Sequence, residues 1–147
     1  MIFHFCENKC FHLYSKSGPF STNALSEELQ TRPASVTDML KRLKEKKLLH
    51  YEPYYGVKLN DEGRQLALRI VRRHRLWEYF LSEKLKFEWD AVHEIAEELE
   101  HVSSTELINR LDAFLGYPQT DPHGDPIPDT SGNMVVTSQM TLQQLGE

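Results

Sequence analysis

The chain has 147 residues, of which 39% are hydrophobic and 27% charged, with 7 glycines, 7 prolines and 2 cysteines. This composition is typical of a globular protein and excludes collagen-like and intrinsically disordered chains. No run of apolar residues approaches the roughly 18 that span a bilayer, and residues 1–5 are too few for a signal peptide. The sequence therefore predicts a cytoplasmic protein that does not bind membranes. Cys6 and Cys10 are too few to cross-link the chain and are expected to be free thiols or soft metal ligands.

The net charge of −5 is unevenly distributed. Residues 32–75 contain 12 Lys and Arg against 5 Asp and Glu, whereas residues 76–130 contain 3 against 13. A basic region favours phosphate, and an acidic region rich in Glu and His either faces water or holds cations. The alternative is that these are two solvated faces of opposite sign.

Short helices and turns are expected in the first half of the chain. The residue pattern predicts helices over residues 11–16 and 21–30, and a basic helix over 34–47 that Pro33 opens. The apolar residues of this basic helix follow a helical spacing: Val36, Met39, Leu40 and Leu43. Residues 48–59 predict a β-hairpin, since β-branched and aromatic residues flank a glycine-containing turn.

Helices also dominate the second half. Residues 60–63 supply an N-cap for a long helix over 64–84, whose apolar positions are Leu66, Ile70, Leu76, Trp77, Phe80 and Leu81. Two further helices are expected over 89–101 and 104–114. Residues 116–132 contain four prolines and three glycines, which indicates a structured turn or a linker. From Met134 onward the pattern predicts the first strand and turn of a further element.

Two short helices, the second of them basic, followed by a hairpin predict a winged helix-turn-helix. A helix fits the major groove of DNA, small residues at its start allow close approach to bases, and cations along it neutralise phosphates. The candidate DNA-binding residues are Arg32, Ala34, Ser35, Thr37, Asp38, Lys41, Arg42 and Lys44, with Tyr54 and Tyr55 at the hairpin tip. The alternative is a basic surface helix without a ligand.

His and Glu recur at helical spacing in the acidic region. His74 and Glu78 are four residues apart, as are His93, Glu97 and His101 in series, and Glu100 follows Glu97 by three. Spacing of four places side chains on one face, so two such helices packed together present nitrogen and oxygen donors to a shared cation. Donors of this kind suit Mn(II), Fe(II), Zn(II) or Co(II).

Enzyme motifs are only partly present. The residues from His93 to Glu97 begin like the zinc-peptidase motif His-Glu-x-x-His, but glutamate occupies the second histidine position. Residues 98–101 form one Glu-x-x-His, whereas a di-iron carboxylate bundle uses two. Two alternatives stay open. One is a di-iron or di-manganese helical enzyme with an accessory winged-helix domain, and the other is a winged-helix regulator that has lost metal control.

Four stretches in order carry a family resemblance: STNALSEELQTRPASVTDMLKRLKEKKLLHYEPYYGVKLNDEG, RRHRLWEYFL, VHEIAEELEHVSS and DPHGDPIP. Together they resemble the DtxR/MntR family of metal-dependent transcriptional repressors. The resemblance implies a mainly α fold with a small β wing, in which a winged helix-turn-helix domain precedes a helical dimerisation domain. It also implies a homodimer that binds palindromic double-stranded operator DNA and controls metal-uptake genes, with Mn(II) or Fe(II) as corepressor.

The same resemblance implies a division of the chain and of its metal ligands. Residues 1–63 are expected to bind DNA, 64–130 to bind metal and dimerise, and 131–147 to form a linker and the first part of an SH3-like domain. One implied metal site consists of His74, Glu78, His93 and Glu97, and the adjacent one includes Glu97, Glu100 and His101. Glutamate at position 97 is typical of the manganese-responsive branch of the family, whereas the iron-responsive branch has cysteine there.

The first ten residues depart from the family pattern. Phe5 and Asn8 stand where ligands of the second site are expected, and a phenylalanine side chain cannot coordinate a metal. Either Cys6, Glu7, Asn8 or Cys10 substitutes for the missing ligand, or the second site is incomplete.

Overall fold

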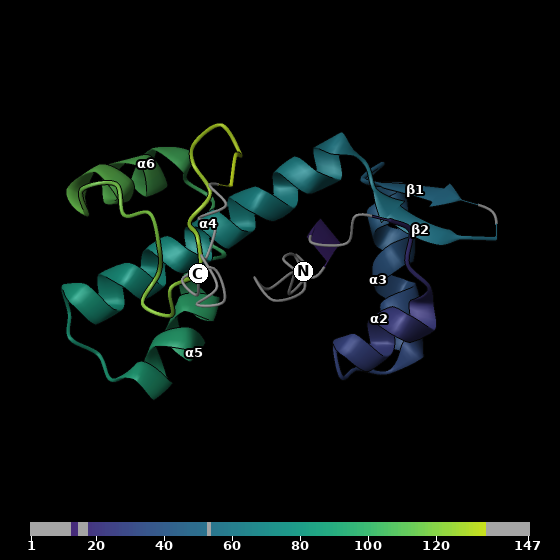
Figure 1. The fold of residues 1–147 in the computed structure, drawn as a ribbon, viewed down its shortest axis with the longest axis horizontal. Coiled ribbons are helices and arrows are strands. Elements are labelled where there is room, and N and C mark those ends of the chain that lie inside the picture. Colours follow the sequence, from purple (N-terminus) through teal and green to yellow (C-terminus); the bar gives the residue numbers. More distant parts are fainter. Residues whose placement is uncertain (1–12, 15–17, 53, 135–147) are drawn as a thin grey trace, which may run out of the picture.

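The computed structural model describes residues 13–14, 18–52 and 54–134. Within these ranges the named elements are five helices and two antiparallel strands, as a mainly α fold with a small β wing requires. In chain order they are α2 (Thr22–Glu28), α3 (Pro33–Glu45), β1 (Leu49–Glu52), β2 (Gly56–Leu59), α4 (Asp61–Glu83), α5 (Trp89–Leu99) and α6 (Thr105–Phe114). Figure 1 shows α2, α3 and the strands at one end of the long helix α4, and α5 and α6 at the other.

The helix-turn-helix pair is confirmed with slightly shorter helices than predicted. Helix α2 begins after Ser21, whose hydroxyl oxygen accepts a hydrogen bond from the Ala24 backbone N–H at 3.1 Å. Helix α3 begins at Pro33, as predicted, and ends at Glu45 because Lys47 adopts a φ of 57°. Val36, Leu40 and Leu43 are buried, so the predicted apolar face of this helix is the one that packs.

The hairpin forms the predicted wing, with Leu49 paired to Leu59. Phe20 extends it through a β-bridge to Val57, with backbone hydrogen bonds of 2.9 and 3.0 Å. Gly56 makes this approach possible because its φ is 119° and an added Cβ would lie 2.3 Å from the carbonyl oxygen of Phe20. The wing is therefore fixed to the segment that leads into α2.

Helix α4 begins three residues earlier than predicted because Asn60 is its N-cap. The Asn60 side-chain oxygen accepts a hydrogen bond from the Gly63 N–H at 2.8 Å, and its side-chain nitrogen donates to the Lys47 carbonyl. The 23 residues of α4 extend about 35 Å. Its first turns bury Ala67 and Val71 in the core of the helix-turn-helix and wing, so one continuous helix joins both ends of the molecule.

Helices α5 and α6 pack against the second half of α4. Two apolar clusters hold them there, one around Leu76 and Ile108 and the other around Leu81 and Val92. The segment 116–134 is a structured loop rather than a free linker: Ile127 is buried against α4 and α6, and Thr120 forms a β-bridge with Pro126. Figure 1 shows this segment leaving α6 and crossing α4.

Some predictions lie outside the described residues. They are most of the helix expected over 11–16 and the element expected beyond Met134. Of the first, Leu13 is described and is buried in the core. No helix in the described parts of the chain has the length and apolar character that crossing a membrane requires.

Candidate metal centre and DNA-binding face

The buried face of α4 carries polar side chains in its second half. His74 and Glu78, one helical turn apart, are only 1% and 2% exposed. His93 of α5 lies opposite them and is partly exposed. Because burying a polar or charged group is costly unless it has partners, a cluster in this position requires each group to satisfy the others or a ligand.

Three ligand atoms converge in this cluster. Glu78 Oε1 lies 3.0 Å from His74 Nε2 and 3.0 Å from His93 Nδ1, and the two imidazole nitrogens are 3.2 Å apart. Ligand atoms bonded at about 2.1 Å to one tetrahedral or octahedral cation lie about 3.0–3.4 Å from one another. The spacing of the three atoms therefore fits a shared divalent cation, and His74, Glu78 and His93 are the residues that would hold it.

The electrostatics of the cluster keep Glu78 ionised. Burial alone raises its pKa, but hydrogen bonds with His74 and His93 and the charges of His74 and His123 outweigh burial, so the pKa falls from 4.5 to about 2. Glu78 is thus a carboxylate at neutral pH, which is the form that coordinates a metal.

Glu100 supports His74 from behind. Its Oε2 atom lies 2.7 Å from His74 Nδ1, and the Glu100 side chain is fully buried. A carboxylate that accepts from Nδ1 leaves Nε2 as the nitrogen that would bind a cation, which would replace the proton that Nε2 shares with Glu78, and this arrangement is common behind metal-ligating histidines. The sequence analysis assigned Glu100 to the adjacent metal site. In the structure one of its oxygens contacts His74, a candidate ligand of the first site.

Glu97 and His101 lie outside the buried cluster. Glu97 Oε1 is 3.7 Å from His93 Nε2, and both side chains are partly exposed. His101 is exposed just beyond α5, and the structure does not bring it to the three converging atoms. The candidate N-terminal ligands Cys6, Glu7, Asn8 and Cys10 lie outside the described residues, as does Phe5.

His123 is a residue that the sequence analysis missed. Its Nε2 atom lies 3.5 Å from Glu78 Oε1, and its ring packs edge-on against Trp89 with centroids 4.8 Å apart. The residue comes from the 116–134 loop, so helical spacing gave no signal for it. The available signal was its position inside a stretch rich in Asp, Pro and Gly, which forms a tight turn.

Arg75 fixes this loop against α4. Its guanidinium donates to the Pro126 carbonyl at 2.5 Å and lies 3.9 Å from the Asp121 carboxylate. Asp121 in turn accepts hydrogen bonds from the His123 and Asp125 backbone N–H groups. Burial and the neighbouring charge of Glu78 raise the pKa of Asp121, while the Asp125 N–H and Arg75 lower it, with burial the largest effect.

The predicted DNA-binding residues lie on one end of the molecule. Thr37 is half-buried and the remaining α3 and preceding candidates are exposed: Arg32, Ala34, Ser35, Asp38, Lys41, Arg42 and Lys44. At the tip of the wing Tyr54 and Tyr55 are 103% and 74% exposed. The exposed surface of α3 thus combines small residues in its first turn with cations further along, as contact with a duplex requires.

Two family models match consecutive parts of the chain. The model described as "Iron dependent repressor, N-terminal DNA binding domain" matches residues 11–57, and the model described as "Iron dependent repressor, metal binding and dimerisation domain" matches residues 60–129. The chain therefore belongs to the iron-dependent repressor family, the DtxR/MntR family of metal-dependent transcriptional repressors. This family consists of transcriptional repressors and not enzymes, which removes the metal-dependent enzyme as an alternative.

Curated relatives agree with this assignment. The iron-dependent repressor IdeR of Mycobacterium tuberculosis is 34% identical over 104 residues, which are 71% of this chain and 45% of that protein. An uncharacterised helix-turn-helix transcriptional regulator of Methanocaldococcus jannaschii is 35% identical over 97 residues, or 66% of this chain and 78% of that protein.

Solved structures are also similar. A manganese-dependent transcriptional repressor in complex with manganese has a TM-score of 0.73 and 39% identity, covering 87% of this chain and 60% of the other. The manganese regulator SloR has a TM-score of 0.77 and 33% identity, covering 96% of this chain and 66% of the other. The chain thus spans less than half of the mycobacterial repressor and about two thirds or less of these two structures.

Proposed function

We propose that this protein binds palindromic operator DNA as a homodimer when loaded with a divalent metal, with Mn(II) preferred over Fe(II), and represses genes for metal uptake. The observation that carries the proposal is the convergence of His74, Glu78 and His93 on one side of the helix that also enters the winged-helix core. In this proposal residues 1–63 of the chain bind DNA, and residues 64–130 bind metal and form the dimer.

The donor set supports the choice of metal. Two imidazoles and carboxylates suit Mn(II), Fe(II), Zn(II) and Co(II), and the described part of the cluster contains no thiolate to select a softer ion. A bound divalent cation supplies positive charge that joins the imidazoles and carboxylates of α4 and α5. Glutamate at position 97 and the manganese named for similar structures support Mn(II) as the physiological metal.

Exposed apolar residues in the second half of the chain support the homodimer. The large ones there are Leu85, Phe87, Trp89, Leu107, Phe114 and Tyr117. Many exposed apolar residues on one part of a protein are typical of surfaces that a partner covers. A second copy of the chain packed there would place a second α3 for the other half of a palindromic site.

Helix α4 connects the candidate metal site to the DNA-binding part of the chain. It carries His74 and Glu78 towards one end, and near the other end Ala67 and Val71 pack beneath α2, α3 and the wing. Any change in how α5 packs on α4 therefore moves a surface to which the DNA-binding part is attached. A cation that favours one of these arrangements shifts the population towards it by its differential affinity, with a coupling of about 1–3 kcal/mol.

Anaerobic fluorescence anisotropy with a duplex from upstream of the protein's own gene tests this function. We expect binding that strengthens with Mn(II), weakens with salt and is absent on a scrambled duplex. The metal and the DNA must also raise each other's affinity by the same factor. Equal DNA affinity with and without Mn(II) or Fe(II) contradicts metal control. The remaining interpretation would then be a winged-helix regulator that has lost its response to metal.

A further inference from the structure

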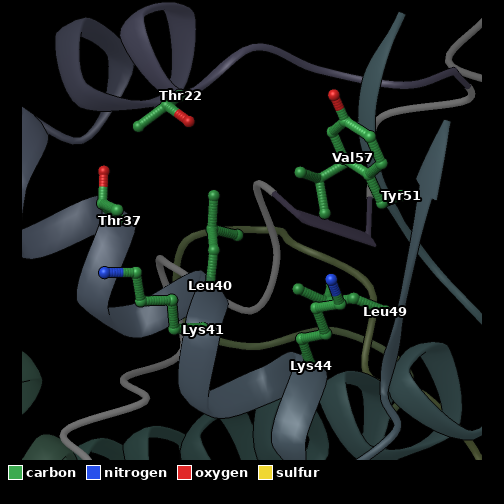
Figure 2. A pocket seen from close by; sticks show the side chains of 8 residues that line it. All are labelled: Thr22, Thr37, Leu40, Lys41, Lys44, Leu49, Tyr51 and Val57. Carbon is green, nitrogen blue, oxygen red and sulfur yellow. The ribbon is translucent and has the colours of Figure 1, made fainter. Parts of the chain in front are cut away.

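A cavity of about 280 Å³ lies between α3 and the wing. Figure 2 shows Leu40 at its centre, with Tyr51 and Val57 of the wing on one side and Thr22 and Thr37 on the other. Leu40 is nearly buried, and Val57 and Tyr51 complete an apolar wall with Leu49 beneath them. The interior is therefore apolar, although the cavity opens on the face that carries the DNA-binding candidates.

Two cations stand at the rim of this cavity. In Figure 2 the Lys44 side chain extends towards the wing residues, and Lys41 extends towards Thr37. Among the described residues, no salt bridge involves either lysine. The Thr37 hydroxyl already donates to the Pro33 carbonyl at 3.0 Å. The cavity thus offers two ammonium groups and the Thr22 hydroxyl around an apolar interior, which is complementary to a molecule with an anionic head and an apolar body.

We propose that this cavity binds a small amphipathic organic acid, with its carboxylate at Lys44 and its hydrocarbon part against Leu40 and Val57. Because Thr37, Lys41 and Lys44 also belong to the predicted DNA-binding face, a bound anion there repels the phosphates of a duplex and occupies part of their surface. The protein would then respond to an organic acid in addition to a metal ion.

The apolar interior favours an organic acid over a DNA phosphate as the occupant. A phosphodiester can use the lysines of the rim, but it gains little from Leu40, Leu49 and Val57. Each methylene that leaves water for this interior raises the affinity about fourfold. The apolar wall therefore adds affinity only for a ligand that carries a hydrocarbon chain or ring.

Titration of the methyl-labelled full chain with octanoate, below its micelle concentration, tests the site by NMR. We expect saturable shifts confined to the methyl groups of Leu40, Leu49 and Val57. Acetate lacks the hydrocarbon chain and 1-octanol lacks the charge. Each should therefore bind at least about tenfold more weakly than octanoate. Absence of these shifts, or equal binding of octanoate and octanol, overturns the proposal.

Two variants locate the ligand within the cavity. Val57→Phe fills part of the interior and should weaken octanoate binding by about tenfold or more, because the phenyl ring takes the space of the octanoate chain. Val102→Phe makes the same change at an exposed position near α6 and should leave octanoate binding unchanged. Lys44→Met removes a rim charge but keeps the apolar stem, so octanoate should bind more weakly while octanol does not. Unchanged octanoate affinity in both cavity variants overturns the assignment.

The competition with DNA rests on the proposed function and has its own measurement. Octanoate should raise the apparent Kd for the labelled duplex in the unmodified protein and in Val102→Phe, but not in Val57→Phe. If the protein binds no duplex while the methyl shifts persist, the proposed function fails and the ligand site stands. If duplex alone shifts the three cavity methyls and octanoate does not, the cavity belongs to the DNA interface and the proposal is overturned.

Discussion

His74 connects the two sides of the candidate metal centre. Its Nε2 faces Glu78 and His93, while its Nδ1 lies 2.7 Å from Glu100. Because a buried carboxylate at Nδ1 favours a proton on that nitrogen, we expect Glu100 to be a positioning residue for this candidate site. A carboxylate in this position holds the imidazole ring in place, and the oxygen that contacts the ring does not itself bind the metal.

Glu100→Gln tests that positioning role. The amide keeps the size of the side chain but loses the charge that favours the Nδ1 proton, so Mn(II) affinity should fall by about 10–100-fold in calorimetry. Glu98→Gln makes the same change at an exposed position of α5 and should leave Mn(II) affinity unchanged. Equal losses in both variants would assign the effect to net charge rather than to His74.

Gly56 sets the approach of the wing to Phe20. Gly56→Ala should reduce the free energy of unfolding by about 2–4 kcal/mol, because it adds a backbone clash to an unfavourable φ. Gly116→Ala, also at positive φ but with no atom within 4 Å of an added Cβ, should cost only about 1 kcal/mol. Urea unfolding measures both, and equal losses would show that the close approach to Phe20 is unimportant.

At the scale of elements, the attachment of α6 to α4 depends on a buried ion pair. Arg72 Nη2 lies 2.7 Å from Asp112 Oδ2, and Arg72 Nη1 donates to the side chain of Asn109 at 3.2 Å. A buried pair contributes little net stability over an apolar substitute, but each partner alone is costly. The pair therefore fixes the register of α6 on α4 more than it adds stability.

Arg72→Leu should destabilise the protein by about 3 kcal/mol, because it leaves the Asp112 carboxylate buried without its partner. The double variant Arg72→Leu with Asp112→Leu should recover most of that loss. Arg110→Ala, which breaks the exposed pair with Glu106, should cost less than about 1 kcal/mol. Thermal or urea unfolding decides, and a double variant no more stable than the single one contradicts the argument.

For the whole molecule, charge is separated along the length of α4. The basic residues of α3 lie at one end, and the Glu-rich α5 with the candidate metal ligands lies at the other. This separation keeps the phosphates of a duplex away from the carboxylates and leaves those carboxylates available to a cation. DNA affinity should therefore depend on the cations of the α3 end alone.

Lys44→Gln with Lys46→Gln should weaken binding to all duplexes and lower the slope of log K against log salt by about one for each phosphate that is no longer neutralised. Lys84→Gln with Lys86→Gln removes the same charge near the other end of α4 and should leave the slope unchanged. Anisotropy at several salt concentrations measures both pairs. A loss confined to one DNA sequence would mean that Lys44 or Lys46 contacts bases.

The sequence by itself determined the order of the elements and the buried face of α3. In α4 it was right for Leu76 and Leu81, but Leu66 and Ile70 are only partly buried, and Ala67, Leu68 and Val71 pack in their place. Periodicity placed Val36, Leu40 and Leu43 in the core, and capping residues and prolines gave helix starts to within a few residues, because these signals are local. The spacing of His74 and Glu78 is equally local, so the sequence could propose them as a pair on one face.

Only the tertiary structure decided which of the candidate ligands meet. Packing of α5 on α4 brings His93 to Glu78, places Glu100 behind His74 and leaves His101 exposed, because crossing angle and register have no local signature. His123 reaches Glu78 from a loop that carries no helical periodicity. The cavity between α3 and the wing likewise arises from residues up to 35 positions apart in the sequence, Thr22 and Val57, which only folding brings together.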